Sequence, residues 1–196
     1  MGVFALMTDA STAGQTQLGG EMTEGTGEYN TPLSWVAPLA DTVAGFDLDP
    51  CASADSDLAD KNIRETGGLE ADWADLVTPN SYVGEAYDSW VWCNHPYARG
   101  EPEKWLAKAH DSPLNVVTLS RSDTSTAAFG EWHTAADLIC WPNTASERGD
   151  PRVQFVGEED PADFPVVFAV FLGDFRDSVP QALRDVVERW GVVTSL

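Results

Sequence analysis

The chain has 196 residues, of which 43% are hydrophobic and eight are tryptophan, enough for one sizeable core. Its longest apolar run, residues 166–172, is far shorter than the roughly 20 residues of a membrane helix, and three scattered cysteines without a CxxC pair exclude a disulfide framework or a zinc ribbon. The 32 acidic and 11 basic residues give a formal net charge of −21, which excludes an ordinary basic nucleic-acid binder.

Residues 1–28 are rich in Gly and Thr without apolar periodicity, which predicts a flexible leader before a single domain over residues 29–196. A helix is predicted to end near Gly45, with Thr31 as its cap and Pro32 at its first position. A short strand over residues 45–49, the loop PCAS and a polar helix over residues 55–64 are expected next.

The following segments alternate between the two kinds of element. Strands are predicted over residues 89–94, 115–120 and 137–141, and helices over residues 101–110 and 124–134. This alternation is typical of an α/β fold with a mostly parallel sheet. Residues 152–156 and 164–172 are expected to form an antiparallel hairpin that closes one sheet edge. The last helix is predicted between the cap Ser178 and Gly191.

Ligands of an open α/β sheet bind beyond the carboxyl ends of its strands, and FDLDPCAS, residues 46–53, is the first such end. Asp47 and Asp49 share one face of the strand, and Pro50 and Cys51 begin a turn of small residues. A carboxylate here can hold an ammonium or a ribose hydroxyl. Two alternatives stay open: an acidic surface turn, or the metal-binding pair of a nuclease, although no downstream Glu-x-Lys is found.

The second strand end is VWCNHPY, residues 91–97, in which polar Asn94 directly follows an apolar run. An exocyclic amine carries two N–H donors, and its attack on a methyl sulfonium requires a free lone pair. The Asn94 side-chain oxygen and the His95 main-chain carbonyl can accept those two hydrogens. Pro96 would fix the turn, and Tyr97 would stack on a base flipped out of a duplex. The alternative is a tight turn with a core tyrosine.

In these segments the chain resembles the phage DNA N-6-adenine-methyltransferase (Dam) family. The resemblance covers about residues 30–173 and follows the family's order: TPLSWVAPL, FDLDPCAS, the Gly-Leu and Trp of GGLEADW, NHPY, WLAKA, SRSDTSTAAF, RVQF and DFPVVFAVF. It implies a Rossmann-like methyltransferase fold, S-adenosylmethionine as the cofactor, and adenine N6 in double-stranded DNA as the methyl acceptor, with no metal.

The resemblance also implies roles for individual residues. Asn94, His95 through its carbonyl, Pro96 and Tyr97 would hold the target base. The cofactor would be bound by a larger set: Thr31 and Pro32 near its methionine end, Asp47, Asp49, Pro50, Cys51 and Asn94 along its pocket, and Asp72 near its adenine.

Two residues depart from the family pattern. His95 replaces the first proline of the usual Asn-Pro-Pro-Tyr motif, which keeps the main-chain acceptor but makes the turn less rigid and adds a titratable ring. Ser120 stands at a position that is often proline, which leaves the role of the neighbouring Arg121 open.

Contacts with DNA phosphates are expected from Arg99, Arg121, Arg148 and Arg152, each of which could instead form a surface ion pair. At 1 M salt the Debye length is about 3 Å, so diffuse repulsion between an acidic protein and DNA is almost lost. Acidic residues in every segment and only three lysines therefore predict a protein of a halophilic virus or its host, acting in a salty host cytoplasm.

Two other functions remain open at this point. The same chemistry would suit RNA or a protein amide as the methyl acceptor, because the motif fits any planar amine. A protein of another class, a catalytically silent viral homologue, would bind the cofactor or DNA without transferring a methyl group.

Overall fold

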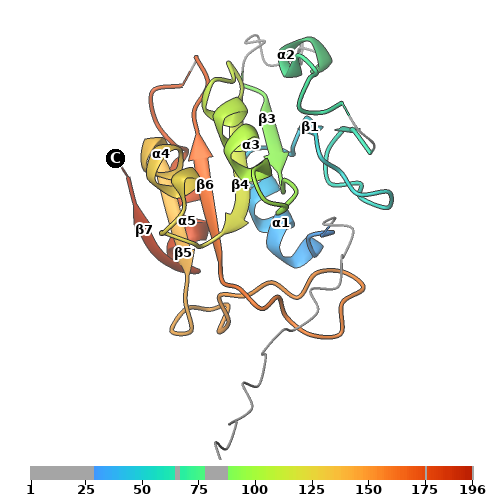
Figure 1. Ribbon diagram of the computed structural model, residues 1–196. Coiled ribbons are helices and arrows are strands. Elements are labelled where there is room, and N and C mark those ends of the chain that lie inside the picture. The colour runs from blue at the N-terminus through green and yellow to red at the C-terminus, as the bar shows by residue number, and fades with distance from the viewer. Residues whose placement is uncertain (1–28, 65–66, 78–87, 175, 196) are drawn as a thin grey trace, which may run out of the picture.

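The computed structural model describes residues 29–64, 67–77, 88–174 and 176–195, so the predicted leader, residues 1–28, lies outside the described residues. One sheet has the strand order β2-β1-β3-β4-β6-β5-β7 (Figure 1). Its strands are β1 (Leu48–Asp49), β2 (Lys61–Asn62), β3 (Trp90–Cys93), β4 (Asn115–Arg121), β5 (Leu138–Pro142), β6 (Val166–Phe171) and β7 (Gly191–Thr194). Strands β2, β1, β3 and β4 are parallel, whereas β6 runs antiparallel to β4 and β5, and β7 runs antiparallel to β5. The predicted α/β class with a mostly parallel central sheet is confirmed.

Helices cover both faces of this sheet (Figure 1). They are α1 (Leu33–Ala40), α2 (Trp73–Leu76), α3 (Glu101–His110), α4 (Ala127–Glu131), the 3-10 helix η1 (His133–Ala135) and α5 (Gln181–Glu188). The apolar residues of α1 and α5 pack with one face of the sheet, and those of α3 and α4 pack with the other. The core therefore has two layers, one on each face of the sheet, which is why the central strands are buried on both sides.

The predicted hairpin at the sheet edge is wrong. Residues 152–156 form no strand, and β6 lies inside the sheet between β4 and β5. All six residues of β6 are buried, so its unbroken apolar run is that of an interior strand rather than of an edge. Residues 152–156 instead contact the stretch of chain before α1, where the Val156 amide donates to the Asn30 carbonyl at 2.9 Å.

Three smaller expectations also fail. Residues 55–64 form no helix, because they have no apolar face and their amides instead follow β1: Lys61 donates to the Asp47 carbonyl at 3.0 Å. Pro32, not Thr31, is the N-cap of α1, and no side chain caps this helix. The last helix, Gln181–Glu188, has Pro180 rather than Ser178 as its N-cap and ends before Gly191, which begins β7, where a Cβ would lie 1.8 Å from the Trp141 carbonyl oxygen.

The GGLEADW segment packs against the PCAS turn through a glycine. A Cβ on Gly68 would lie 1.7 Å from the Pro50 carbonyl oxygen, closer than any side chain can approach. The Gly68 carbonyl accepts a 2.7 Å hydrogen bond from the indole of buried Trp73. The glycine and the tryptophan of the motif therefore hold one loop against the carboxyl end of β1.

We expect Gly68→Ala to lower the free energy of unfolding by about 1–3 kcal/mol, because the added methyl group forces the PCAS turn to shift. Gly130→Ala is the matched control, since a Cβ at Gly130 in α4 meets no atom within 4 Å. It should leave stability unchanged or raise it by up to about 1 kcal/mol. Urea unfolding of both variants measures the difference, and equal stabilities would contradict the proposed close contact.

Candidate active site

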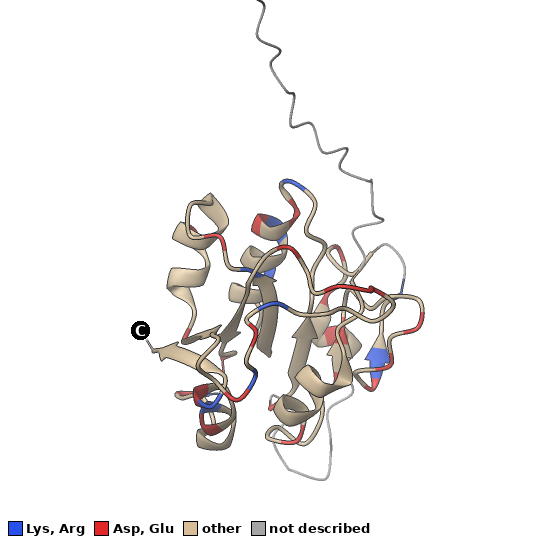
Figure 2. Cartoon of the chain, turned by 90° about the horizontal axis from the view of Figure 1, so that it is seen from below, with Lys and Arg blue, Asp and Glu red and all other residues tan. Residues whose placement is uncertain are grey.

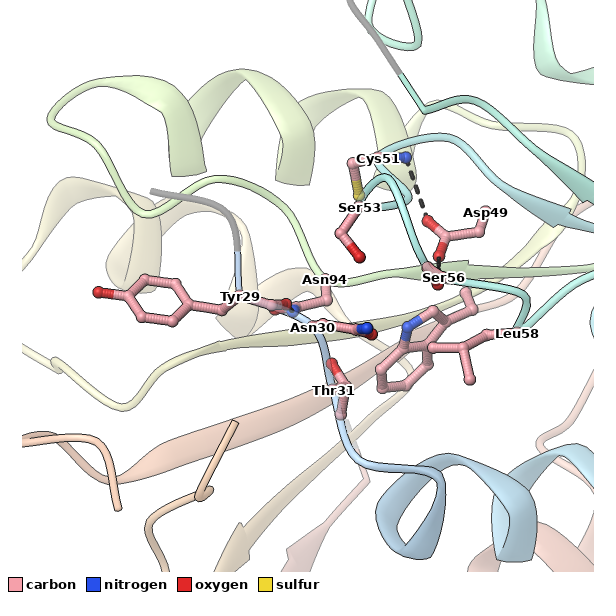
Figure 3. Close-up of a pocket in the computed structure, with 10 residues that line it drawn as sticks. Tyr29, Asn30, Thr31, Asp49, Cys51, Ser53, Ser56, Leu58 and Asn94 are labelled. Carbon is pink, nitrogen blue, oxygen red and sulfur yellow. Dashed lines mark hydrogen bonds between the residues drawn. The ribbon is translucent and has the colours of Figure 1, made fainter. Parts of the chain in front are cut away.

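A small recess lies at the carboxyl ends of β1 and β3, where the chain also passes just before α1 (Figure 3). Its empty volume, open solvent included, is about 170 Å³, so it accommodates no more than one end of a drug-sized ligand. The recess is lined by Tyr29, Asn30, Thr31, Asp49, Cys51, Ser53, Ser56, Leu58, Trp92 and Asn94.

Asp49 is the buried acid of the recess, with 3% of its surface exposed. Its carboxylate accepts hydrogen bonds from the Cys51 amide at 3.1 Å and from the Ser56 hydroxyl at 3.4 Å. Burial is the largest influence on this group and raises the pKa of Asp49 to about 7. A positively charged ligand group would restore the ionised carboxylate, so the recess suits an ammonium.

Two buried hydroxyls in the recess have no hydrogen-bond partner among the described residues, namely those of Thr31 and Ser53. Their oxygens point into the recess from opposite sides (Figure 3). Because an unpaired buried hydroxyl is costly, these two groups are donors that await an acceptor. A ligand end that carries both an ammonium and a carboxylate would satisfy Asp49 and the hydroxyls together.

The Asn94 side chain is oriented by two neighbours. Its Nδ2 donates to the Tyr29 carbonyl, which can only accept, so the amide nitrogen must face Tyr29. Its Oδ1 accepts from the Tyr97 hydroxyl at 2.6 Å. A carbonyl oxygen has two lone pairs, so one acceptor position of Asn94 remains for a ligand.

Tyr97 belongs to an aromatic group beside Asn94. Its ring centre lies 5.4 Å from that of Tyr29, 5.3 Å from that of Phe164 and 6.3 Å from that of Phe155. Burial raises the pKa of Tyr97 well above its ordinary value, so its hydroxyl stays a donor to Asn94. Phe155 and Phe164 are buried, whereas Tyr29 and Tyr97 are half-buried, so the two tyrosines are the members of this group that present ring surface next to the Asn94 amide.

The sequence pattern located the centre of this site but not all of its wall. Of the predicted residues, Thr31, Asp49, Cys51 and Asn94 line the recess. Tyr29, Asn30, Ser53, Ser56, Leu58 and Trp92 were missed. Ser53 and Ser56 could have been found from their place within and just after the turn of small residues, whereas the part of Tyr29 depends on tertiary packing.

Several predicted cofactor residues lie elsewhere. The Asp47 carboxylate accepts from the main-chain amide of Trp90 at 2.7 Å and so joins β1 to β3. Pro50 is buried against Gly68, and Pro32 is the N-cap of α1. Asp72 caps α2 by accepting from the Ala74 amide at 3.0 Å, and Figure 1 shows α2 at the end of the sheet away from the arrowhead of β3. The structure therefore does not bring Asp72 into the recess.

Two of the four predicted DNA-binding arginines are held by contacts within the protein, and the other two are exposed. The Arg148 guanidinium lies 4.3 Å from the ring centres of both Trp35 and Trp190 and donates to the Ser34 carbonyl at 2.6 Å, so it is part of the packing. Arg152 forms a 2.9 Å ion pair with Asp150. Arg99 and Arg121 are exposed beside the site: one lies in the turn after β3, and the other, at the end of β4, rests 4.5 Å from the ring of Phe164.

Two further findings concern the described part of the chain. Its helices include none that is long and apolar enough to cross a membrane. Its side chains include no group of three or more His, Cys, Asp or Glu residues placed to hold a metal ion.

The sequence matches the family DNA N-6-adenine-methyltransferase (Dam) over residues 22–167, which include the recess and the turn of Asn94 to Tyr97. Because this match spans most of the chain, the protein belongs to the DNA N-6-adenine-methyltransferase (Dam) family. The mixed sheet is consistent with a methyltransferase-like fold. The comparisons with curated proteins and with solved structures gave no match. A halophilic or viral origin stays a prediction.

We expect Asp49→Asn to change how stability depends on pH. Burial raises the folded-state pKa of Asp49 to about 7, above its ordinary value of 3.8, so its contribution to stability is present below pH 3.8 and is lost as pH rises through 7. The variant lacks this loss and should gain roughly 1.4 kcal/mol relative to the parent for each pH unit between about 4 and 7. Urea unfolding at several pH values measures this gain, and a constant difference would contradict it.

Proposed function

We propose that this protein transfers a methyl group from S-adenosylmethionine to N6 of a flipped adenine in DNA. The observation that carries the proposal is a single recess in which an ammonium site at Asp49 and the amide of Asn94 lie together, in a chain of the Dam family. We also infer a Rossmann-like methyltransferase sheet in one domain over residues 29–196.

The donor set of the recess fits the amino-acid end of S-adenosylmethionine. Asp49 would hold the ammonium, and the unpaired hydroxyls of Thr31 and Ser53 would donate to the carboxylate. When bound, this cofactor supplies a methyl group on a positively charged sulfur. The recess takes in only part of so large a molecule, so the rest would extend beyond it.

Asn94 and the His95 carbonyl would accept the two hydrogens of the adenine amino group. The Tyr29 carbonyl and the Tyr97 hydroxyl already hold the Asn94 amide in one orientation, with one lone pair of Oδ1 still free. Two acceptors that draw the N–H bonds out of the plane of the ring would favour a tetrahedral nitrogen, whose lone pair is no longer conjugated with the ring. Residues of this chain thus supply orientation and lone-pair release, and water can take the proton after transfer.

Aromatic stacking would offset the cost of extruding the base. Flipping costs a few kcal/mol, and stacking on an aromatic side chain contributes about 1–3 kcal/mol per base. Half-buried Tyr97 is the candidate stacking surface beside Asn94, and the buried rings of Phe155 and Phe164 pack against it. Arg99 and Arg121 are the best placed of the four arginines for contacts with phosphates, because both are exposed near this turn.

Incubation of the purified protein with DNA and cofactor labelled in its methyl group tests the proposal directly. We expect labelled N6-methyladenine in the digested nucleosides, measured by mass spectrometry, with more product in molar potassium chloride than in dilute buffer. The reason for the salt effect is the net charge of −21, whose repulsion from phosphates salt screens. If calorimetry shows cofactor binding but no labelled nucleoside forms, the protein is a catalytically silent binder. If label appears in RNA alone, the methyl acceptor is RNA rather than DNA.

We expect Asn94→Ala to abolish methyl transfer while the Kd for the cofactor stays within about threefold of the parent, because the base loses an acceptor but Asp49, Thr31 and Ser53 remain. Asn94→Asp keeps an oxygen acceptor and should retain measurable transfer, although its carboxylate faces the Tyr29 carbonyl. Asn143→Ala, in the turn after β5, is the control. Parent-like transfer by the alanine variant at position 94 would refute the role of this residue.

A further inference from the structure

Ser120 and His95 form a buried hydrogen bond between the ends of neighbouring strands. The Ser120 Oγ lies 2.8 Å from His95 Nε2, and the two residues are 2% and 1% exposed. Ser120 is at the end of β4, and His95 is in the turn that follows β3. The contact therefore ties this turn to the adjacent strand.

The second ring nitrogen fixes the direction of that hydrogen bond. His95 Nδ1 lies 3.1 Å from the Pro96 carbonyl oxygen, which can only accept. Nδ1 therefore carries the hydrogen, Nε2 of the neutral ring is an acceptor, and the Ser120 hydroxyl is the donor.

The environment keeps this ring neutral. Burial lowers the pKa of His95 to about 4. A second buried ring, that of His133, lies nearby. Burial lowers the pKa of His133, and the proximity of His95 lowers it further. At neutral pH the ring of His95 thus has one donor and one acceptor, and each has its partner.

The ring also supports the residues that would bind the adenine. Its plane meets that of Tyr97 at 74° with ring centres 5.6 Å apart. Asn94 precedes His95, and the His95 carbonyl is the proposed second acceptor. A ring fixed at Nδ1 and Nε2 therefore limits the motion of Asn94, of that carbonyl and of Tyr97 at once.

We propose that Ser120 is a positioning residue for methyl transfer, which acts by holding His95 and, through it, the turn of Asn94 to Tyr97. This inference rests on the proposed function. His95 and Ser120 are also the two positions at which the sequence departs from the proline of the family pattern, and in this fold they contact one another. A side-chain hydrogen bond takes the place of a rigid ring in the main chain.

The kinetic test compares three variants of the full chain. Ser120→Ala should lower kcat for transfer to DNA about tenfold, because the turn of Asn94 to Tyr97 loses its anchor. The KM for the cofactor should stay within twofold of the parent, because the contacts of Asp49 are unchanged. Ser120→Thr keeps the hydroxyl and should restore most of the rate. Thr118→Val is the matched control, since it removes a buried hydroxyl from β4 that contacts the Ala169 carbonyl at 3.4 Å. Equal losses at positions 118 and 120 would overturn the inference.

A double-variant cycle tests whether Ser120 acts through His95. Phenylalanine keeps the ring shape of His95 but has no nitrogen, so Ser120→Ala added to His95→Phe should cost no further activity. The same tenfold loss in both backgrounds would show that Ser120 acts on something else.

A spectroscopic readout separates this inference from the proposed function. Nitrogen-15 NMR of the full-length protein should show His95 as the Nδ1–H tautomer at neutral pH. Ser120→Ala should shift the Nε2 resonance and the amide resonances of residues 94, 95 and 97, and Thr118→Val should not. An Nε2–H tautomer or unchanged resonances would overturn the inference even if DNA is methylated. Absence of methylation with the expected spectra would overturn the proposed function and leave Ser120 as an anchor of the turn alone.

Discussion

Strands β1 and β3 are joined by a reciprocal pair of hydrogen bonds between Asp47 and Trp90, and the candidate site depends on this pairing. The Asp47 amide donates to the Trp90 carbonyl at 2.8 Å, and the Asp47 carboxylate accepts from the Trp90 amide at 2.7 Å. The side chain of the residue just before β1, a strand of only two residues, thus accepts a hydrogen bond from the main chain of β3. Asp49 and Asn94 follow within a few residues on the two strands, so fixing the strands also fixes the distance between the proposed ammonium site and the proposed base acceptor.

Sequence reasoning was most successful where a pattern has a local physical cause. The apolar run before Asn94 and the helical pattern of residues 101–110 correctly placed β3 and α3, because burial of apolar residues depends on their spacing. Asp49 and Asn94 were found as polar groups that end apolar strands. Polar residues 55–64 were misassigned as a helix because some of their amides pair with the β1 segment, a partner that local spacing does not reveal. Strand β6 was misplaced at a sheet edge because its neighbours, β4 and β5, come from distant segments of the chain.

The charge of the chain constrains how it can meet DNA. Figure 2 shows Asp and Glu spread over loops and helices in that view, with few Lys and Arg among them. Some of the basic side chains are engaged in packing or ion pairs, as Arg148 is between Trp35 and Trp190. The proposed association with DNA phosphates would therefore depend on a few local contacts and on salt screening of the repulsion from the acidic surface. Its affinity would rise with salt, whereas that of a basic protein that releases counterions falls.

The wall of the recess includes residues that precede the first helix. Asn94 donates to the main chain at Tyr29, Thr31 offers its hydroxyl to the interior, and Asn30 accepts from the Val156 amide. A ligand that engages Thr31 must therefore stabilise the docked position of this stretch of chain. By thermodynamic reciprocity, any event that draws the same stretch away from β3 weakens ligand affinity by an equal factor. Access to the recess and attachment of the amino-terminal portion of the domain are in this way two measures of one equilibrium.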